Sequence, residues 1–205
     1  MNNYHYIVAS LPAISRDWSF TDRDFSSFME EITSQCSSKD ITMIEFLEKG
    51  FKEENLNEEF YKEALSHRNR FVREYFTFDL NIRNAKVKYL NKALGRPAGK
   101  DVMNLGGEEF EESPRIEAVL KGTDILERER GIDDLMWAKI DELTTFDYFD
   151  IECILGFIAK LHIIDRWYTL DEQSGREMFK KLVDEVRGTF KGVEFDSENT
   201  TKTNK

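Results

Sequence analysis

Hydrophobic residues between Ser66 and Gly95 recur every three or four positions, which is the spacing of one face of an α-helix. The stripe consists of Phe71, Tyr75, Phe78, Ile82, Ala85, Tyr89 and Ala93. Gly95 and Pro97 predict where the helix ends, because glycine readily adopts the left-handed conformation beyond a helix and proline cannot continue one. We therefore expect a long amphipathic helix here, with a kink or break at 67–69 if it begins as early as Glu58.

Shorter patterns of the same kind predict further helices on both sides. Thr21 followed by Asp24 resembles a capping box that begins the first of them, and Gly131 divides a later one into two pieces. The expected helices span 25–32, 40–49, 58–94, 114–121, 125–129, 132–143, 146–168 and 171–187. The opening stretch, residues 4–12, is too short for its period to distinguish a strand from a helical turn.

The most apolar of these predicted helices, 146–168, should be the buried centre of the fold. Its hydrophobic residues cover most of the helix circumference rather than one face. Six charged residues interrupt it, so it contains no uncharged run of the ~18 residues that a membrane span requires. Together the patterns predict an all-α protein, an elongated multi-helix bundle of about seven to nine helices.

The segment 95–113 is the best candidate for a linker, because it contains four glycines and one proline and has no sustained hydrophobic period. We expect one helical domain over 1–192, or two lobes hinged near 95–113, and a disordered tail at 193–205. The segment contains GGEEF at Gly106–Phe110, which matches the signature pentapeptide of diguanylate cyclases. No alternating strand pattern precedes it, so we interpret the match as a coincidence.

Charge is distributed unevenly along the chain. The whole sequence has a net charge of −11, which argues against nucleic-acid binding because phosphate contacts need positive charge. The stretch from Ser66 to Arg96, however, contains eight Lys and Arg residues and only two acidic ones. Two interpretations stay open for this basic helix: a solvated face paired with acidic neighbours in the same chain, or a docking surface for an acidic partner.

Three charged residues of this helix lie close to its apolar seam. Asp79, Arg83 and Lys86 occupy positions i, i+4 and i+7, so they share one side of the helix and can pair along it. Charges at such a boundary commonly pair or fix the register of a neighbouring helix. We interpret the trio first as structural and second as part of an interaction surface.

The residue patterns of common enzymes are missing. The three histidines are scattered, and neither a phosphate-binding G-x-x-x-x-G-K-[ST] loop nor a G-x-S-x-G motif is present. Glu63 and His67 are four residues apart, but such a lone pair is more often an exposed helix contact than a metal site. Cys36 and Cys153 are too few for a disulfide framework, and Cys153 should be an inert thiol in an apolar helix. We therefore expect no catalysis, cofactor or metal, and, without a secretory signal, a cytoplasmic protein.

Two stretches resemble a known family, the C-type (or d-type) socket protein of the V/A-type ATPase central stalk. YHYIVASLPAI, residues 4–14, resembles the N-terminal opening of that family. FDLNIRNAKVKYLNKALG, residues 78–95, resembles the family's helix in which an Asp/Asn-rich turn precedes a basic amphipathic run. Most of the chain, including FVREYFTFDLNIRNAKVKYLNKALGRP at 71–97, is still more similar to a short, uncharacterised bacterial family encoded among V-type ATPase genes.

The resemblance implies a role and not a reaction. Members of the socket family are helical proteins that lie between the central rotor shaft and the membrane ring of proteolipids. A similar chain would be a non-catalytic central-stalk component that couples ATP turnover to proton or sodium transport. Its partners would be the rotor-shaft subunits and the proteolipid ring, which it would meet at the inner membrane without insertion. Because this chain is shorter than the usual socket protein, with its three similar helical modules, the resemblance implies a reduced socket.

The position of residues on the basic helix suggests which of them contact a partner. These are Arg73, Asp79, Arg83, Asn84 and Lys86. Complementary charge between this helix and an acidic surface would favour docking. The alternative function is a cytoplasmic helical adaptor or regulator that binds an acidic protein partner through the same basic amphipathic helix.

Overall fold

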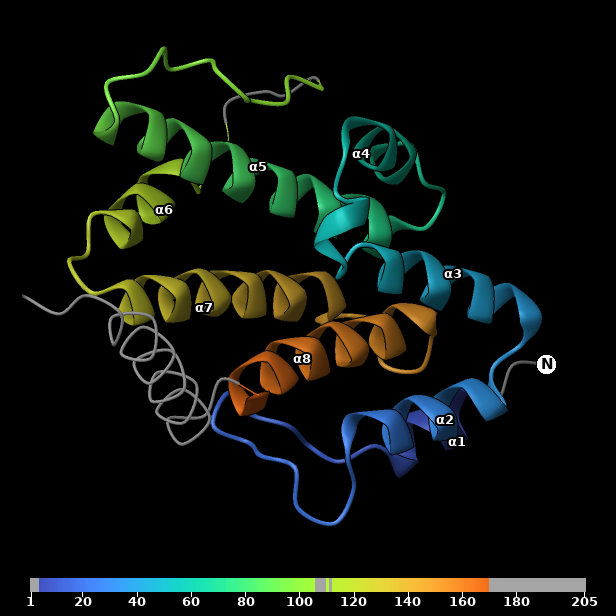
Figure 1. Cartoon of the computed structure of the whole chain (residues 1–205). Helices are drawn as coiled ribbons and strands as arrows, with labels where there is room; N and C mark the ends of the chain where they lie inside the picture. Colours follow the sequence, from blue (N-terminus) through green and yellow to red (C-terminus); the bar gives the residue numbers. More distant parts are fainter. Residues whose placement is uncertain (1–3, 106–109, 111, 170–205) are drawn as a thin grey trace, which may run out of the picture. The chain divides into compact units, whose positions relative to one another are not determined.

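The computed structural model describes residues 4–105, 110 and 112–169, and every regular element among them is helical. This confirms the prediction of an all-α, multi-helix fold (Figure 1). The helices are α1 (Tyr4–Ser10), α2 (Phe25–Gln35), α3 (Ser38–Lys49), the 3₁₀ helix η1 (Glu53–Asn55), α4 (Glu58–Leu65), α5 (Arg70–Ala93), α6 (Ser113–Leu120), α7 (Ile125–Thr144) and α8 (Ile151–Thr169). The expected helix at 171–187 and the expected tail at 193–205 lie outside the described residues.

Contacts between residues divide the chain into two units, 1–165 and 166–205. The second unit is described only at 166–169, the end of α8, where the Arg166 guanidinium lies 5.7 Å from the centroid of the Trp167 ring. The first unit contains all the other described helices. In it α5, which precedes the segment 95–113, packs against α6 and α7, which follow that segment. The hinge near 95–113 stays a prediction.

The predicted long helix is α5, and it begins at the predicted break. Asn69 caps its N-terminus, because the Asn69 side chain accepts a hydrogen bond from the Val72 backbone N–H, and the separate helix α4 ends at Leu65. At the other end Gly95 has a φ of +63°, the left-handed conformation that glycine adopts without strain. The helix therefore starts and stops where the sequence pattern changes.

The predicted central helix corresponds to α8, and most of its residues in the first unit are buried. Gly156 lets α8 approach its neighbours closely: a Cβ atom there would lie 2.6 Å from Thr144 Cγ2 of α7 and 3.5 Å from the Phe71 ring of α5. The helix begins at Ile151 rather than at residue 146, with the Asp150 carboxylate accepting a hydrogen bond from the Cys153 backbone N–H. None of the described helices is long and apolar enough to cross a membrane.

The start of α2 corrects the sequence prediction. Asp24, and not Thr21, is its N-cap, because the Asp24 carboxylate accepts a 2.9 Å hydrogen bond from the Ser27 backbone N–H. The Asp24 side chain also accepts hydrogen bonds from the hydroxyls of Ser26 and Ser27, and these bonds lower its pKa. The opening stretch, whose geometry the period left undecided, folds as the short helix α1.

The structure also corrects the predicted break at Gly131. This residue lies inside the continuous helix α7, where a Cβ atom would come within 2.7 Å of Val119 Cγ1 on α6. The glycine therefore allows α6 and α7 to pack closely instead of ending a helix. This close contact places the first turns of α7 beside the C-terminal half of α5 (Figure 1).

Candidate functional site

The polar residues that the sequence singled out on α5 are held by different neighbours. Asp79 accepts a 2.6 Å hydrogen bond from the Tyr61 hydroxyl of α4. Loss of contact with water raises the pKa of Asp79, whereas the Tyr61 hydroxyl and the charges of Arg83 and Lys86 lower it. Part of the Asp79 residue remains accessible, so the carboxylate lies at the edge of the core rather than deep inside it. Its main partner comes from another helix and not from the predicted i+4 residue.

Arg83 follows Asp79 by one helical turn and acts on this cluster through its charge. Burial raises the pKa of Tyr61, and the Asp79 carboxylate raises it further, while the positive charge of Arg83 opposes both effects. The Arg83 Nε atom is buried, and no described residue accepts a hydrogen bond from it. Arg83 is therefore an incompletely satisfied cation at the edge of the contact between α4 and α5.

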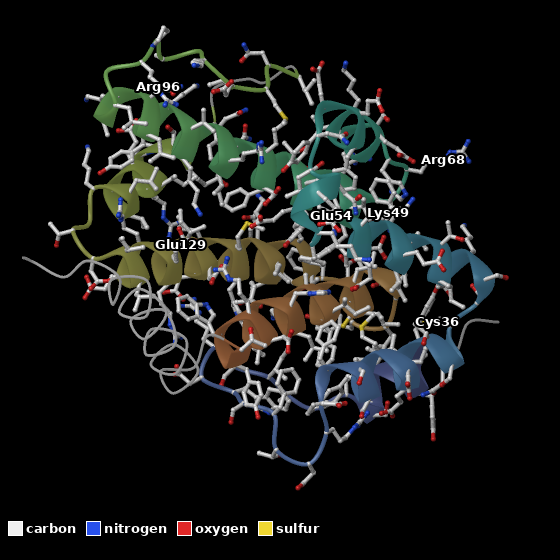
Figure 2. All side chains as sticks on the ribbon, in the orientation of Figure 1. Cys36, Lys49, Glu54, Arg68, Arg96 and Glu129 are labelled. Carbon is white, nitrogen blue, oxygen red and sulfur yellow. The ribbon has the colours of Figure 1, made fainter. Side chains whose placement is uncertain are left out.

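Lys86 joins α5 to α7. Its ammonium group lies 3.0 Å from one carboxylate oxygen of Glu129 and 3.1 Å from the other. The two side chains are 33% and 38% exposed, so solvent screens the pair. Figure 2 labels Glu129 on α7, on the side that faces α5. The pair supports one of the two open interpretations, in which basic residues of α5 meet acidic residues of the same chain.

Replacing Lys86 by methionine should therefore have a small effect on stability. We expect the free energy of unfolding to fall by less than about 1 kcal/mol, because a partly exposed ion pair contributes little. Urea denaturation followed by circular dichroism would measure this change, with Glu129→Gln as the matched variant on α7. A loss of several kcal/mol from either substitution would contradict the solvent-screened pair.

Two asparagines of α5 hold the segment that follows the helix. The Asn84 amide donates a 2.9 Å hydrogen bond to the Met103 carbonyl oxygen and accepts a 3.0 Å hydrogen bond from the Met103 backbone N–H. One heptad later, the buried Asn91 side chain donates to the carbonyl oxygen of Lys100 at 2.7 Å. Sequence reasoning missed the role of Asn91. The seven-residue spacing of the two asparagines, which places them on one side of the helix, was the available signal.

Arg73 stabilises the junction between α4 and α5. Its guanidinium donates a 3.1 Å hydrogen bond to the His67 carbonyl oxygen, and its Nε lies 3.4 Å from a Glu74 carboxylate oxygen. All five residues predicted to contact a partner therefore also interact within the chain. Whether they contact a partner stays a prediction.

Other cations near the end of α5 are exposed and form no ion pair with a described residue. They are Lys88, Lys92, Arg96 and Lys100. Figure 2 labels Arg96 just beyond the C-terminal end of α5. This end of the helix is thus the part of the basic stretch that is not neutralised by the described fold.

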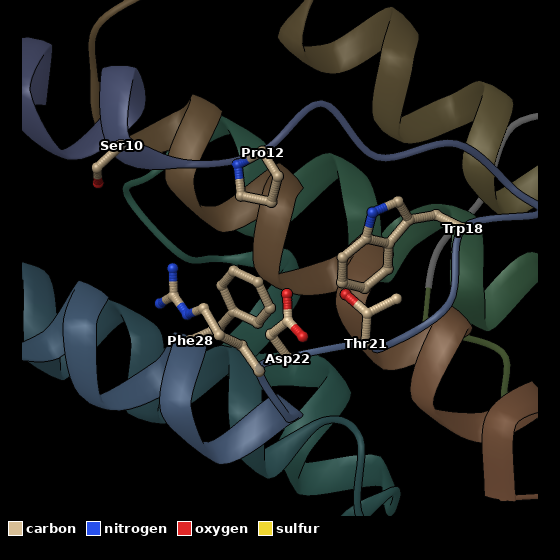
Figure 3. Close-up of a pocket in the computed structure, with 7 residues that line it drawn as sticks. Ser10, Pro12, Trp18, Thr21, Asp22 and Phe28 are labelled. Carbon is tan, nitrogen blue, oxygen red and sulfur yellow. The ribbon is translucent and has the colours of Figure 1, made fainter.

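A cavity of about 290 Å³ lies between α2 and the segment that joins α1 to it (Figure 3). Its lining consists of Ser10, Pro12, Trp18, Thr21, Asp22, Arg23 and Phe28. The Arg23 guanidinium is occupied by the Glu31 carboxylate and lies 4.1 Å from the centroid of the Phe28 ring. The Ser10 hydroxyl donates to the Ile7 carbonyl oxygen. The lining brings no acid–base pair or nucleophile–base pair together, so we assign no chemistry to this cavity.

The remaining candidates for chemistry have structural partners. No group of three or more His, Cys, Asp or Glu side chains among the described residues is placed to hold a metal ion. His67 Nδ1 accepts a hydrogen bond from the Asn69 backbone N–H, and the His67 ring stacks on Phe46 at 5.1 Å. Burial raises the pKa of Cys36 to about 11 and also raises that of Cys153, so both thiols are protonated at neutral pH.

The GGEEF motif lies outside the described residues except for Phe110. The Phe110 ring packs edge-on against Phe78 of α5, with 5.4 Å between the centroids. This contact is hydrophobic, and it attaches the segment after α5 to the core.

Comparisons with known proteins give one match. None of the curated proteins matches the chain, and no solved structure matches it. Residues 98–189 match the model of a family described as a protein of unknown function, DUF2764. The matched part begins in the segment after α5 and includes α6, α7 and α8.

Proposed function

We propose that the chain is a non-catalytic central-stalk component of a bacterial V-type ATPase or ATP synthase. It would connect the rotor shaft to the proteolipid ring through protein–protein contacts, at the cytoplasmic face of the inner membrane, and so take part in proton or sodium transport. The observation that carries the proposal concerns residues 71–97, which bear the resemblance to the ATPase-linked families. These residues form α5 and its end, the helix against which α4, α6 and α7 pack.

The attachments of α5 are suited to a part that transmits force. The helix is connected to α4 through Tyr61 and Asp79, to α7 through Lys86 and Glu129, and to the following segment through Asn84. Contacts distributed along its length would resist bending of α5 relative to its neighbours. A joint between a rotating shaft and a ring requires such resistance, whereas it does not require a pocket or catalytic residues.

The alternative, a cytoplasmic adaptor or regulator, has one observation in its favour. The exposed cations at the end of α5 would attract an acidic protein whether or not it belongs to a rotary motor. The two functions differ in the identity of the partner and not in the type of contact. Only an experiment that identifies the partner can therefore separate them.

Affinity purification of the tagged full chain from its native cells, in mild detergent, tests the proposal. We expect mass spectrometry to recover catalytic and proteolipid ATPase subunits in a fixed ratio, because a stalk component is part of the assembled complex. Cells that express the tag alone provide the control. Recovery of unrelated acidic proteins without ATPase subunits would refute the stalk function and support the adaptor.

A further inference from the structure

Six positions of α5 form one line along the helix. They are Phe76, Leu80, Arg83, Val87, Leu90 and Leu94. Their separations alternate between four and three residues, the spacing that keeps side chains on one side of a helix and that helix–helix contacts use. We call this line the α5 seam. Its residues are apolar except for Arg83.

The first part of the α5 seam is covered. The Phe76 ring meets the Phe60 ring of α4 edge-on, with centroids 5.0 Å apart, and Leu80 is only 3% exposed. Between these two positions, the Asp79 carboxylate accepts the hydrogen bond from the Tyr61 hydroxyl of α4. α4 is therefore the helix that packs beside this part of α5 (Figure 1).

The second part of the α5 seam is uncovered. Leu90 is 54% exposed and Leu94 is 61% exposed, and Val87 is partly exposed. A single exposed leucine is common on a protein surface, but these residues continue a line whose first part is already a helix–helix contact. α5 extends beyond α4 in this direction (Figure 1). The uncovered part has the length and spacing that a further helix would need to pack on α5.

The charge around the uncovered part is positive. From Leu80 to Lys100 the sequence contains six Lys and Arg residues and no Asp or Glu. Arg83 lies in the seam itself, at the boundary between its covered and uncovered parts, and its Nε has no acceptor among the described residues. Lys88 and Lys92 lie on the other side of α5, where they still contribute to the local field within a Debye length of roughly 8–10 Å.

We propose that the uncovered part of the α5 seam binds an amphipathic helix of a partner protein, and that this helix carries acidic residues beside its apolar stripe. Its apolar side chains would cover Val87, Leu90 and Leu94, and its carboxylates would neutralise Arg83 and the cations around it. The inference rests on the proposed function in that it names the surface and the chemistry of a partner contact of the stalk component. It moves the contact from the five polar residues that the sequence suggested to apolar residues one to two turns further along α5.

A second copy of this chain fits the surface poorly. A two-fold symmetric contact would place the α5 seam of one copy against that of the other, so Arg83 and the neighbouring cations would face their own positive charge. An acidic helix meets the same surface with attraction instead of repulsion. Charge complementarity in a chain of net charge −11 therefore favours a different protein as the occupant.

Binding of two designed peptides to the purified full chain tests the proposal. Each peptide is a helix of about three heptads with leucine at the a and d positions, and the flanking positions carry glutamate in one peptide and lysine in the other. Fluorescence anisotropy should show that the chain binds the glutamate peptide at least ~10-fold more tightly than the lysine peptide. Replacing Leu90 and Leu94 by serine together should weaken binding of the glutamate peptide at least ~10-fold.

A matched variant controls for the loss of exposed apolar surface. Phe146 is 86% exposed between α7 and α8, and Phe146→Ser should leave peptide binding unchanged. Thermal unfolding of both variants checks that the fold persists, as expected for substitutions of exposed side chains. Equal binding of the two peptides, or wild-type binding by the Leu90→Ser, Leu94→Ser variant, would overturn the proposal.

Two further outcomes would assign the surface to another occupant and would equally overturn the proposal. One is a dimer, measured by light scattering, that the double serine variant dissociates. The other is binding to phosphatidylglycerol vesicles that the same variant loses. The peptide experiment contains no ATPase components, so it can succeed when the purification from cells refutes the stalk function. Conversely, if the double variant retains the ATPase subunits at the wild-type ratio and the peptides do not bind, only the docking surface is refuted.

Discussion

Replacing Gly50 by alanine should lower the free energy of unfolding by about 3 kcal/mol, because the added methyl group overfills the core. Gly50 ends α3 with φ of −74° and ψ of −12°, a conformation that alanine adopts without strain. The effect comes instead from packing. A Cβ atom at this position would lie 2.2 Å from two carbon atoms of the Phe76 ring and 3.0 Å from Phe60 Cζ.

The Phe76 ring has little room to move away. It is only 1% exposed, and the rings of Phe46, Phe60 and Tyr75 surround it with centroids 6.2, 5.0 and 5.2 Å away. A shift of this ring would therefore disturb the contact of α3 and α4 with α5. Cores that are packed to crystal-like density transmit such displacements instead of absorbing them.

Urea denaturation followed by circular dichroism would measure the effect of Gly50→Ala. Gly99→Ala is the matched control, because no atom lies within 4 Å of a Cβ at that position, and it should remain within about 0.5 kcal/mol of the wild type. Phe76→Leu should be less destabilising in the Gly50→Ala background than alone, since the smaller side chain makes room for the methyl group. Additive effects of the two substitutions would show that the ring and the methyl group do not compete for the same space.

The parts of the fold that the sequence predicted well are those determined by local pattern. The period of hydrophobic residues located α5 and α8, and the change at Gly95 located the end of α5, because helical spacing and backbone preference are properties of neighbouring residues. The exact start of a helix is harder to predict. Thr21 and Asp24 are both good N-caps, and the choice between them depends on where the chain leaves the preceding segment.

The parts that the sequence did not predict depend on which helices meet. Gly131 looked like a break because the sequence does not show that α6 packs against it. Likewise, Lys86 pairs with Glu129, 43 residues away, and Asp79 pairs with Tyr61, 18 residues away, so helical spacing alone suggested the wrong partners. Periodicity places a residue on a face, but only the assembled fold says what that face contacts.

The candidate docking surface shows the same limit. The sequence identified α5 as basic and amphipathic, and both properties are correct descriptions of its residues. It did not reveal that α4 covers the seam near Phe76 and leaves Leu90 and Leu94 exposed. That difference depends on the length and direction of α4, which follow from long-range packing rather than from the pattern of α5 itself.

Replacing Tyr61 by phenylalanine should lower the free energy of unfolding by about 2 kcal/mol at pH 7, because the Asp79 carboxylate loses its hydrogen bond. The folded protein holds the Asp79 proton more tightly than the unfolded chain does, so the pKa of Asp79 is raised on folding. Ionisation of Asp79 as the pH rises through that pKa therefore opposes folding. The Tyr61 hydroxyl, Arg83 and Lys86 reduce this opposition, since each of them lowers the pKa.

Loss of the hydroxyl should raise the pKa of Asp79 further, so the deficit of the Tyr61→Phe variant should be largest where Asp79 is ionised and smaller near pH 4. Urea denaturation at both pH values, with Asp79→Asn as a second background, separates the contributions in a double-mutant cycle. In that background Tyr61→Phe should cost clearly less, because no charge then depends on the hydroxyl. An equal deficit at both pH values and in both backgrounds would mean that Tyr61 stabilises the contact of α4 and α5 by packing alone, and that the Asp79 carboxylate obtains its stabilisation from Arg83 and Lys86.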